Sequence, residues 1–177
     1  EKNIDYILAT FQKEFEFYHN TTSLTVDYIG HPLLEEVAQT ADYEVLRKEF
    51  DVGHNNRFVV GLLPGSRTQE LSNLLPEFLK VAERFKDRYD FILPFATERI
   101  ARHYSPMIPE YIRTQQGRSH DVMACADILI MASGTATLEA SLFTTPMIIT
   151  YKISKITEWI ARKDRKSTRL NSSHGKL

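Results

Sequence analysis

A short run of small polar residues, Ser133-Gly134-Thr135, stands between an apolar segment and a segment rich in Ala and Leu. The apolar segment, residues 128–131, has the length of a buried parallel strand, and the composition after Thr135 predicts a helix that ends near Phe143. Where a strand passes into a helix, free backbone N–H groups, hydroxyl groups and the positive end of the helix dipole converge. Such a turn suits a phosphate group.

Glu139 follows this turn closely, four residues beyond Thr135. The usual role of an acidic residue early in a helix is to complete a capping box, which needs Ser or Thr three residues before it. That position is occupied by Ala136. Glu139 is therefore freer to serve a ligand, for instance by accepting hydrogen bonds from the hydroxyl groups of a sugar.

A second turn of chemical interest, Pro64-Gly65-Ser66-Arg67, follows the apolar run 58–63. Arg67 supplies a permanent planar cation that can bind phosphate oxygens in pairs and stabilise the charge on a leaving diphosphate. The alternative is a surface arginine that caps the next helix, but its place at a strand end favours the ligand role. Ser66 can donate to the same phosphates, cap the helix, or do both.

A third turn brings Gly117 and Arg118 to another strand end. Other chemistries lack their motifs. The six histidines are widely spaced and there is one cysteine, Cys125, so neither a metal site nor a cofactor is predicted. A phosphate-binding Walker loop and a Gly-x-Ser-x-Gly nucleophile are also absent from the sequence.

The three turns connect strands to helices within an alternation of the two that begins at Phe58. Apolar runs predict strands over residues 58–63, 90–93, 111–114, 128–131 and 147–151. Helices are expected over residues 71–85, 97–104, 119–125 and 136–143, the first with a kink or break at Pro76. This order predicts an α/β fold, a Rossmann-like parallel sheet with helices on both faces. Ligands bind such sheets beyond the carboxyl ends of the strands, so the three turns should meet at one crevice.

The first forty residues predict a smaller α/β unit. Strands are expected over residues 6–9 and 26–29, with a helix between them over residues 12–18. Its aromatic residues, among them Phe11, Phe15 and Tyr18, are expected to lie in a core rather than on a membrane-facing surface. His31 stands in the turn Gly30-His31-Pro32, where its ring can cap a neighbouring backbone group.

Composition excludes several classes of function. The chain has 177 residues, with 22 basic and 23 acidic ones, so it lacks the basic field of a nucleic-acid-binding protein. No apolar run approaches the roughly 18 residues of a membrane-spanning helix, and no signal pattern opens the sequence. A single cysteine cannot form an internal disulfide, which fits a reducing cytoplasm, and the apolar neighbours of Cys125 indicate burial. Since the sequence does not begin with Met, we expect it to be an internal part of a longer protein.

Several motifs occur together in a specific order: Y-I-G-H-P-L at 28–33, L-L-P-G-S-R at 62–67, G-R-S-H-D-V-M at 117–123, and S-G-T-A-T-L-E-A from Ser133. In this combination the chain resembles the lipid-A-disaccharide synthases, bacterial glycosyltransferases with two Rossmann-like domains (the GT-B type), over roughly residues 3 to 164. The resemblance implies a truncated two-domain chain. Its expected parts are residues 1–38 from the acceptor domain, a linker at 39–57, an incomplete nucleotide-sugar donor domain at 58–152, a basic crossover helix at 153–166, and a tail at 167–177 that looks like adapter or vector read-through.

The resemblance also implies a reaction. Such enzymes join UDP-2,3-diacylglucosamine to 2,3-diacylglucosamine 1-phosphate with inversion, releasing UDP. Residues of this chain expected to bind the UDP-sugar donor are Ser66, Arg67, Gly117, Arg118, Ser133, Gly134, Thr135 and Glu139. His31 would lie between the two domains. The catalytic acid/base of the family lies upstream, so no catalytic residue is assigned here and the isolated chain is expected to be inactive.

The implied partners are the UDP-sugar donor, the acylated glucosamine phosphate acceptor and a second copy of the full-length enzyme. The implied location is the cytoplasmic face of the inner membrane, where the basic helix 153–166 would rest on anionic lipid or pack across to the first domain. Two alternatives remain open. One is another GT-B enzyme that uses UDP-N-acetylglucosamine, such as the 2-epimerase or the peptidoglycan glycosyltransferase. The other is a non-catalytic nucleotide-binding remnant.

Overall fold

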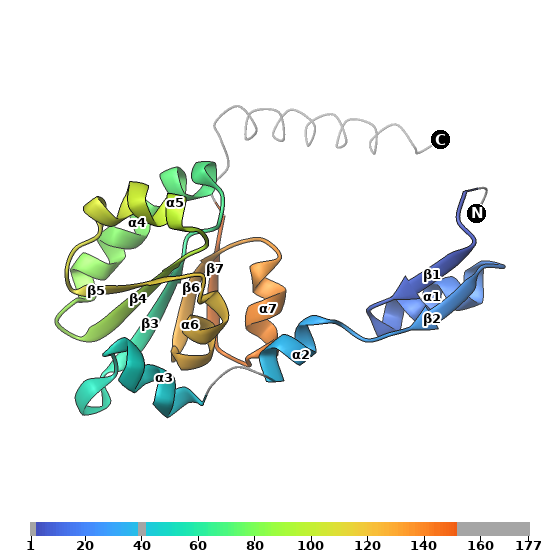
Figure 1. Cartoon of the computed structure of the whole chain (residues 1–177), viewed down its shortest axis with the longest axis horizontal. Helices are drawn as coiled ribbons and strands as arrows, with labels where there is room; N and C mark the ends of the chain where they lie inside the picture. Colours follow the sequence, from blue (N-terminus) through green and yellow to red (C-terminus); the bar gives the residue numbers. More distant parts are fainter. Residues whose placement is uncertain (1–2, 39–41, 152–177) are drawn as a thin grey trace, which may run out of the picture.

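The computed structural model describes residues 3–38 and 42–151 and shows two separate parallel sheets (Figure 1). The expectations for the basic helix and the tail, residues 153–177, lie outside the described residues.

The larger sheet has five strands, all of them parallel, in the order β5-β4-β3-β6-β7. The strands are β3 (Phe58–Leu63), β4 (Tyr89–Phe95), β5 (Ile112–Gln116), β6 (Ile128–Ala132) and β7 (Met147–Thr150). Each is followed or preceded by a helix, as the alternation predicts. The expected α/β fold with a Rossmann-like parallel sheet is therefore confirmed.

Helices cover both faces of this sheet because successive side chains of a strand point to opposite sides. Val60 and Leu62 of β3 pack with α4 (Thr68–Phe85) and α5 (Glu98–Tyr104) on one face. Val59 and Leu63 pack on the other face with α3 (Tyr43–Phe50), α6 (Ser119–Cys125) and α7 (Ala136–Leu142). Short 3-10 turns at His54–Asn56 and Ser105–Met107 complete the connections. Strands buried on both faces explain the near-continuous apolar runs in the sequence.

The face under α6 is packed too tightly for a side chain at Gly61. A Cβ atom there would lie 2.6 Å from Leu129 Cδ2 and 3.3 Å from Ala126 Cβ. The missing side chain lets α6 and β6 approach the central strand.

Helix α4 corrects the expectation of a break at Pro76, whereas a kink there stays a prediction. It runs uninterrupted over 18 residues with Pro76 inside it. Proline removes the N–H that would pair with the carbonyl of Ser72, but both residues are exposed, so water can hydrate that carbonyl. The helix meanwhile buries Leu71, Leu75 and Phe78 against the sheet. Tertiary packing therefore outweighs the local cost of the proline.

Helix α3 lies within the stretch interpreted as a linker and is held against the sheet at the start of β6. The carboxylate of Asp127 accepts hydrogen bonds from the Val59 N–H (2.7 Å) and the Tyr43 hydroxyl (3.1 Å) and pairs with Arg47. Arg47 Nε also donates to the carbonyl of Cys125 at 2.9 Å. Cys125 itself is fully buried, as its neighbours indicated.

The first unit consists of β1 (Tyr6–Ala9), α1 (Gln12–Thr21) and β2 (Thr25–Tyr28), with the two strands parallel, followed by α2 (Leu33–Ala38). The predicted elements are present, but the expectation that the aromatic residues form a core is wrong. Helix α1 has no buried residue, and Phe11 and Tyr18 are 41% and 37% exposed. A two-stranded sheet with one helix offers too little apolar surface to enclose them.

In residues 3–38 and 42–151, no helix is long and apolar enough to cross a membrane.

Candidate functional site

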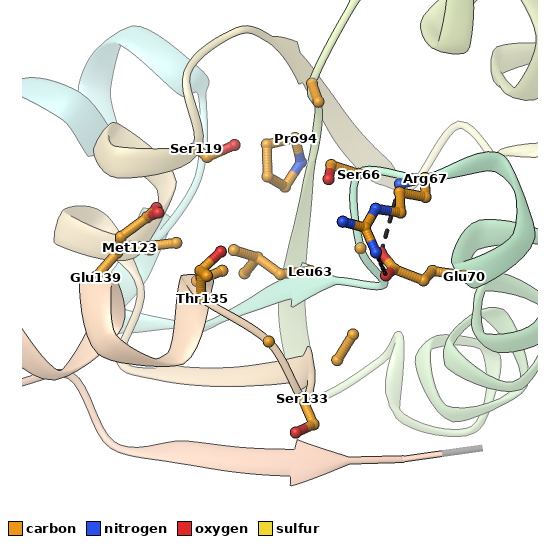
Figure 2. Close-up of a pocket in the computed structure, with 15 residues that line it drawn as sticks. Leu63, Ser66, Arg67, Glu70, Pro94, Ser119, Met123, Ser133, Thr135 and Glu139 are labelled. Atoms are coloured by element: carbon orange, nitrogen blue, oxygen red, sulfur yellow. Dashed lines mark hydrogen bonds and ion pairs between the residues drawn. The ribbon is translucent and has the colours of Figure 1, made fainter. Parts of the chain in front are cut away.

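The order of the strands places a crevice between β3 and β6. From β3 the chain adds β4 and β5 on one side, then crosses back to add β6 and β7 on the other. The direction of winding thus reverses at the β3–β6 pair, and at such a reversal the loops after the two strands diverge and leave room for a ligand. A cleft of about 400 Å³ opens there (Figure 2).

Most of the predicted site residues line this cleft. Its lining includes Ser66 and Arg67 from the loop after β3, and Ser133, Gly134, Thr135 and Glu139 from the loop after β6 and from α7. Figure 2 shows Arg67 on the side of α4, and Thr135 and Glu139 on the opposite side of the view. Two turns read separately in the sequence therefore meet at one cleft.

The loop after β3 presents Arg67 to solvent at the cleft. Its side chain is 84% exposed, and its ion pair with Glu70 is long, with 3.9 Å between Arg67 Nη1 and Glu70 Oε1. Glu70 Oε2 accepts a hydrogen bond from the Arg67 N–H at 3.4 Å and so ties the loop to the first turn of α4. Because an exposed guanidinium in a weak ion pair is easily redirected, Arg67 can turn to a ligand phosphate.

The turn after β6 offers hydroxyl groups and backbone amides. Ser133 and Thr135 are exposed, whereas the Ser133 N–H is already used, because it donates to the carbonyl of Thr150 at 2.9 Å. The first helical hydrogen bond here runs from the Thr137 N–H to the Gly134 carbonyl at 3.1 Å. The amides of Gly134 and Thr135 precede it, at positions where a helix leaves N–H groups open to a ligand.

Glu139 meets a histidine that the sequence did not associate with it. Its Oε2 lies 3.1 Å from His120 Nε2, and the His120 ring lies 5.7 Å, centroid to centroid, from the ring of Phe143. Both side chains are mostly buried, 29% exposed for His120 and 24% for Glu139. Asp121, the next residue along the chain, pairs with Arg118.

Gly117 and Arg118 are not among the residues that line the described cleft. Arg118 Nε donates to Asp121 Oδ2 at 2.6 Å, its guanidinium pairs with Glu49 of α3, and its Cζ lies 4.5 Å from the centroid of the Phe50 ring. The hydrogen bond from Arg118 lowers the pKa of Glu49, so this pair stays charged at neutral pH. Arg118 thus connects α3 to the start of α6, and its contact with a nucleotide base stays a prediction.

Sequence reasoning missed other lining residues, among them Ser119 and Glu70. Glu70 lines the cleft, and its carboxylate accepts a hydrogen bond from the Arg67 N–H. Its spacing of three residues after Arg67 is the signal that was available, since this is the capping-box distance. Ser119 is the first residue of α6, at the end of the third turn.

His31 adopts the capping role of its two interpretations. Its Nδ1 accepts a hydrogen bond from the Leu33 N–H at 3.3 Å, and its ring lies 5.3 Å from the ring of Phe11. A place between two domains stays a prediction for this residue. Within residues 3–38 and 42–151, no cluster of three or more His, Cys, Asp or Glu side chains could hold a metal ion.

Comparison with known proteins gives a consistent result. The family model described as lipid-A-disaccharide synthetase matches residues 1–166. Proteins named lipid-A-disaccharide synthase from Francisella philomiragia and Azotobacter vinelandii are 34% and 35% identical to this chain over 91% and 89% of its length. A protein of the same name from Geobacter sulfurreducens is 34% identical over 90% of it. The matched regions are 43–44% of those relatives, so the chain spans less than half of their length.

Proposed function

The chain belongs to the lipid-A-disaccharide synthase family, and we propose that its cleft binds the UDP-sugar donor of that reaction. The complete protein would transfer a glucosaminyl group from UDP-2,3-diacylglucosamine to 2,3-diacylglucosamine 1-phosphate with inversion, releasing UDP. The observation that carries the proposal is the cleft at the β3–β6 reversal, because it gathers an exposed arginine, two hydroxyl-bearing turns and a carboxylate.

The diphosphate of the donor would bind between Arg67 and the turn Ser133-Gly134-Thr135. Arg67 supplies two parallel N–H donors in a fixed plane, which matches the oxygens of a phosphate. The open amides of Gly134 and Thr135 and the hydroxyl of Ser66 can complete the contact. A helix dipole alone contributes about 0.3–1 kcal/mol, so the guanidinium is the main anchor for the charge.

The sugar part of the nucleotide would lie against Glu139. A carboxylate accepts hydrogen bonds and donates none, so it selects hydroxyl groups over further phosphate oxygens. Arg67 and Glu139 come from opposite sides of the cleft (Figure 2) and so divide it into a place for the diphosphate and a place for the ribose. The base would then reach the rim near Gly117.

Catalysis requires a base on the acceptor hydroxyl, stabilisation of the leaving diphosphate, and alignment of the two substrates. The cleft offers the second of these, since Arg67 and the amides stabilise charge that grows as the glycosidic bond breaks. We propose that the base belongs to the acceptor domain of the complete protein. The isolated chain should therefore bind the nucleotide without transferring sugar.

We also propose the setting of the complete enzyme: a homodimer at the cytoplasmic face of the inner membrane, where the acylated acceptor lies. The family match favours this reaction over those of the 2-epimerase and the peptidoglycan glycosyltransferase. In the complete protein, competition by UDP-sugar donors with and without acyl chains tests that choice. An enzyme that prefers the unacylated donor would contradict it.

Calorimetric titration of the 177-residue chain with UDP, with ADP as the control, tests donor binding directly. We expect UDP to bind and ADP to bind at least tenfold more weakly, since only the base differs and its edges are read by hydrogen bonds. A folded chain with no affinity for UDP would support the remnant interpretation instead.

A further inference from the structure

We propose that His120 is a positioning residue for the ribose of the donor, and that it acts by holding one oxygen of Glu139. The inference rests on the proposed function, because it assigns the ribose to Glu139. In it, His120 Nε2–H donates to Glu139 Oε2, and the other carboxylate oxygen, Oε1, accepts from the ribose.

The geometry of the His120–Glu139 pair supports separate roles for the two carboxylate oxygens. His120 stands on α6 and Glu139 on α7, 19 residues apart, and their polar atoms meet at 3.1 Å. Glu139 lines the cleft, whereas His120 is not among its lining residues. His120 therefore reaches the carboxylate from outside the described cleft, where a ligand does not compete for it.

The surroundings of His120 restrict its ring. The ring of Phe143 lies beside it, and the side chain of His120 is mostly buried. A glutamate side chain otherwise samples many rotamers, and a ligand that binds it must overcome that freedom. A hydrogen bond from a restricted donor removes the freedom before the ligand arrives, so that the carboxylate is preorganised for binding.

Preorganisation of this kind should appear as discrimination between ribose and 2′-deoxyribose. A fixed carboxylate oxygen can accept from a 2′-hydroxyl at defined geometry, whereas a mobile one gains less from that hydroxyl. The measure of the inference is thus the ratio of the Kd for 2′-deoxyuridine diphosphate to the Kd for UDP. That ratio is insensitive to a general loss of affinity, since both nucleotides share the diphosphate and the base.

The experiment titrates both nucleotides into the 177-residue chain and into variants. We expect a ratio of roughly ten or more for the unchanged chain, the value of a hydrogen bond to a charged acceptor. H120A should lower it to near one. H120Q should restore part of it, because its amide nitrogen can donate from nearly the same place. In an E139Q background H120A should leave the ratio unchanged, since the two residues act as one unit.

The matched control is H54A. His54 also pairs with a carboxylate, Asp51, at 2.6 Å, but it stands before β3, at the end of the sheet away from the cleft. This variant should keep the ratio of the unchanged chain.

Two results would overturn the inference, and they are distinguishable. An unchanged chain that discriminates, together with an H120A that discriminates equally well, removes the positioning role and leaves the proposed function standing. An unchanged chain that binds neither nucleotide contradicts the proposed function and the inference together. Should H120A fail to fold, H120L takes its place, because leucine fills much of the same space but donates no hydrogen bond. An H120L that folds and keeps the full ratio would overturn the inference.

Discussion

The side chain of Glu70 fills the space where Gly65 would carry a Cβ atom. A Cβ built on Gly65 would lie 2.7 Å from Glu70 Cβ and 2.4 Å from Glu70 Oε2. The backbone of Gly65 has a φ of +112°, which residues with a side chain rarely adopt. The glycine thus lets the loop fold over the start of α4, where Glu70 holds the Arg67 amide.

From this relationship we predict that Gly65→Ala distorts the loop that carries Ser66 and Arg67. The substitution should cost about 1–3 kcal/mol of stability, because it combines backbone strain with a contact that Glu70 must yield. Urea denaturation measures the cost. Gly134→Ala is the matched control for stability, since a Cβ there meets nothing within 4 Å. Equal stability of the two variants would contradict the prediction.

Removal of the Arg67 guanidinium should weaken UDP binding by roughly tenfold or more, the contribution of a charge-assisted hydrogen bond. Arg67→Lys should recover only part of the affinity, because an ammonium group cannot bind two oxygens in parallel. In the complete protein Arg67→Ala should lower kcat by roughly 10²–10³. Arg102→Ala is the control, since Arg102 is 78% exposed and pairs with Glu98 of its own helix. An Arg67→Ala chain with unaltered UDP affinity would reduce Arg67 to a helix cap.

Asp127 holds α3 to the sheet, so Asp127→Ala should destabilise the chain by about 2–3 kcal/mol. The substitution leaves the Val59 N–H and Arg47 Nη2 without their acceptor. Thermal unfolding followed by circular dichroism measures the effect. Lys80→Ala, which breaks only an exposed pair with Glu77, should leave the midpoint unchanged. A midpoint shift of equal size in both variants would contradict the assignment.

Burial raises the pKa of the Cys125 thiol from 9.0 to about 12. As the pH rises, the thiol ionises in the unfolded chain before it ionises in the folded one. The protonated thiol therefore contributes its full stability below about pH 9, and that contribution declines as the pH rises from about 9 to about 12. The decline should approach 1 kcal/mol per pH unit, on the order expected for one proton. The stability of Cys125→Ala should decline less steeply with pH. The difference between the two proteins separates the effect of the thiol from that of tyrosines, which lose their protons in the same pH range. Identical slopes for the two proteins would refute the burial of a protonated thiol.

The strands and the turns of the large sheet could be predicted because each leaves a local pattern. The runs from Phe58 and Ile128 are continuous and apolar, since both faces of the sheet are covered. The turns at Ser66 and Ser133 are marked by small residues at strand ends. Because the strands of a parallel sheet end at the same edge, and the winding reverses between β3 and β6, those two turns meet at one cleft.

What the sequence could not predict depends on contacts between distant residues. The partner of Glu139 is His120, on another helix. The partners of Arg118 include Glu49, which three strands separate from it in the sequence. Spacing rules cover only neighbours on one helix or strand. The break expected at Pro76 is wrong for a related reason, because the packing that keeps α4 continuous is tertiary.

Donor binding at the cleft is tested most directly by a two-dimensional amide NMR spectrum of the 177-residue chain, titrated with UDP and, as the control, with ADP. We expect dispersed resonances, with UDP-selective shifts at Ser66 and Arg67 on one side of the cleft and at Gly134 and Glu139 on the other. A dispersed spectrum in which UDP moves none of these amides would contradict the claim that the cleft at the β3–β6 reversal binds the donor.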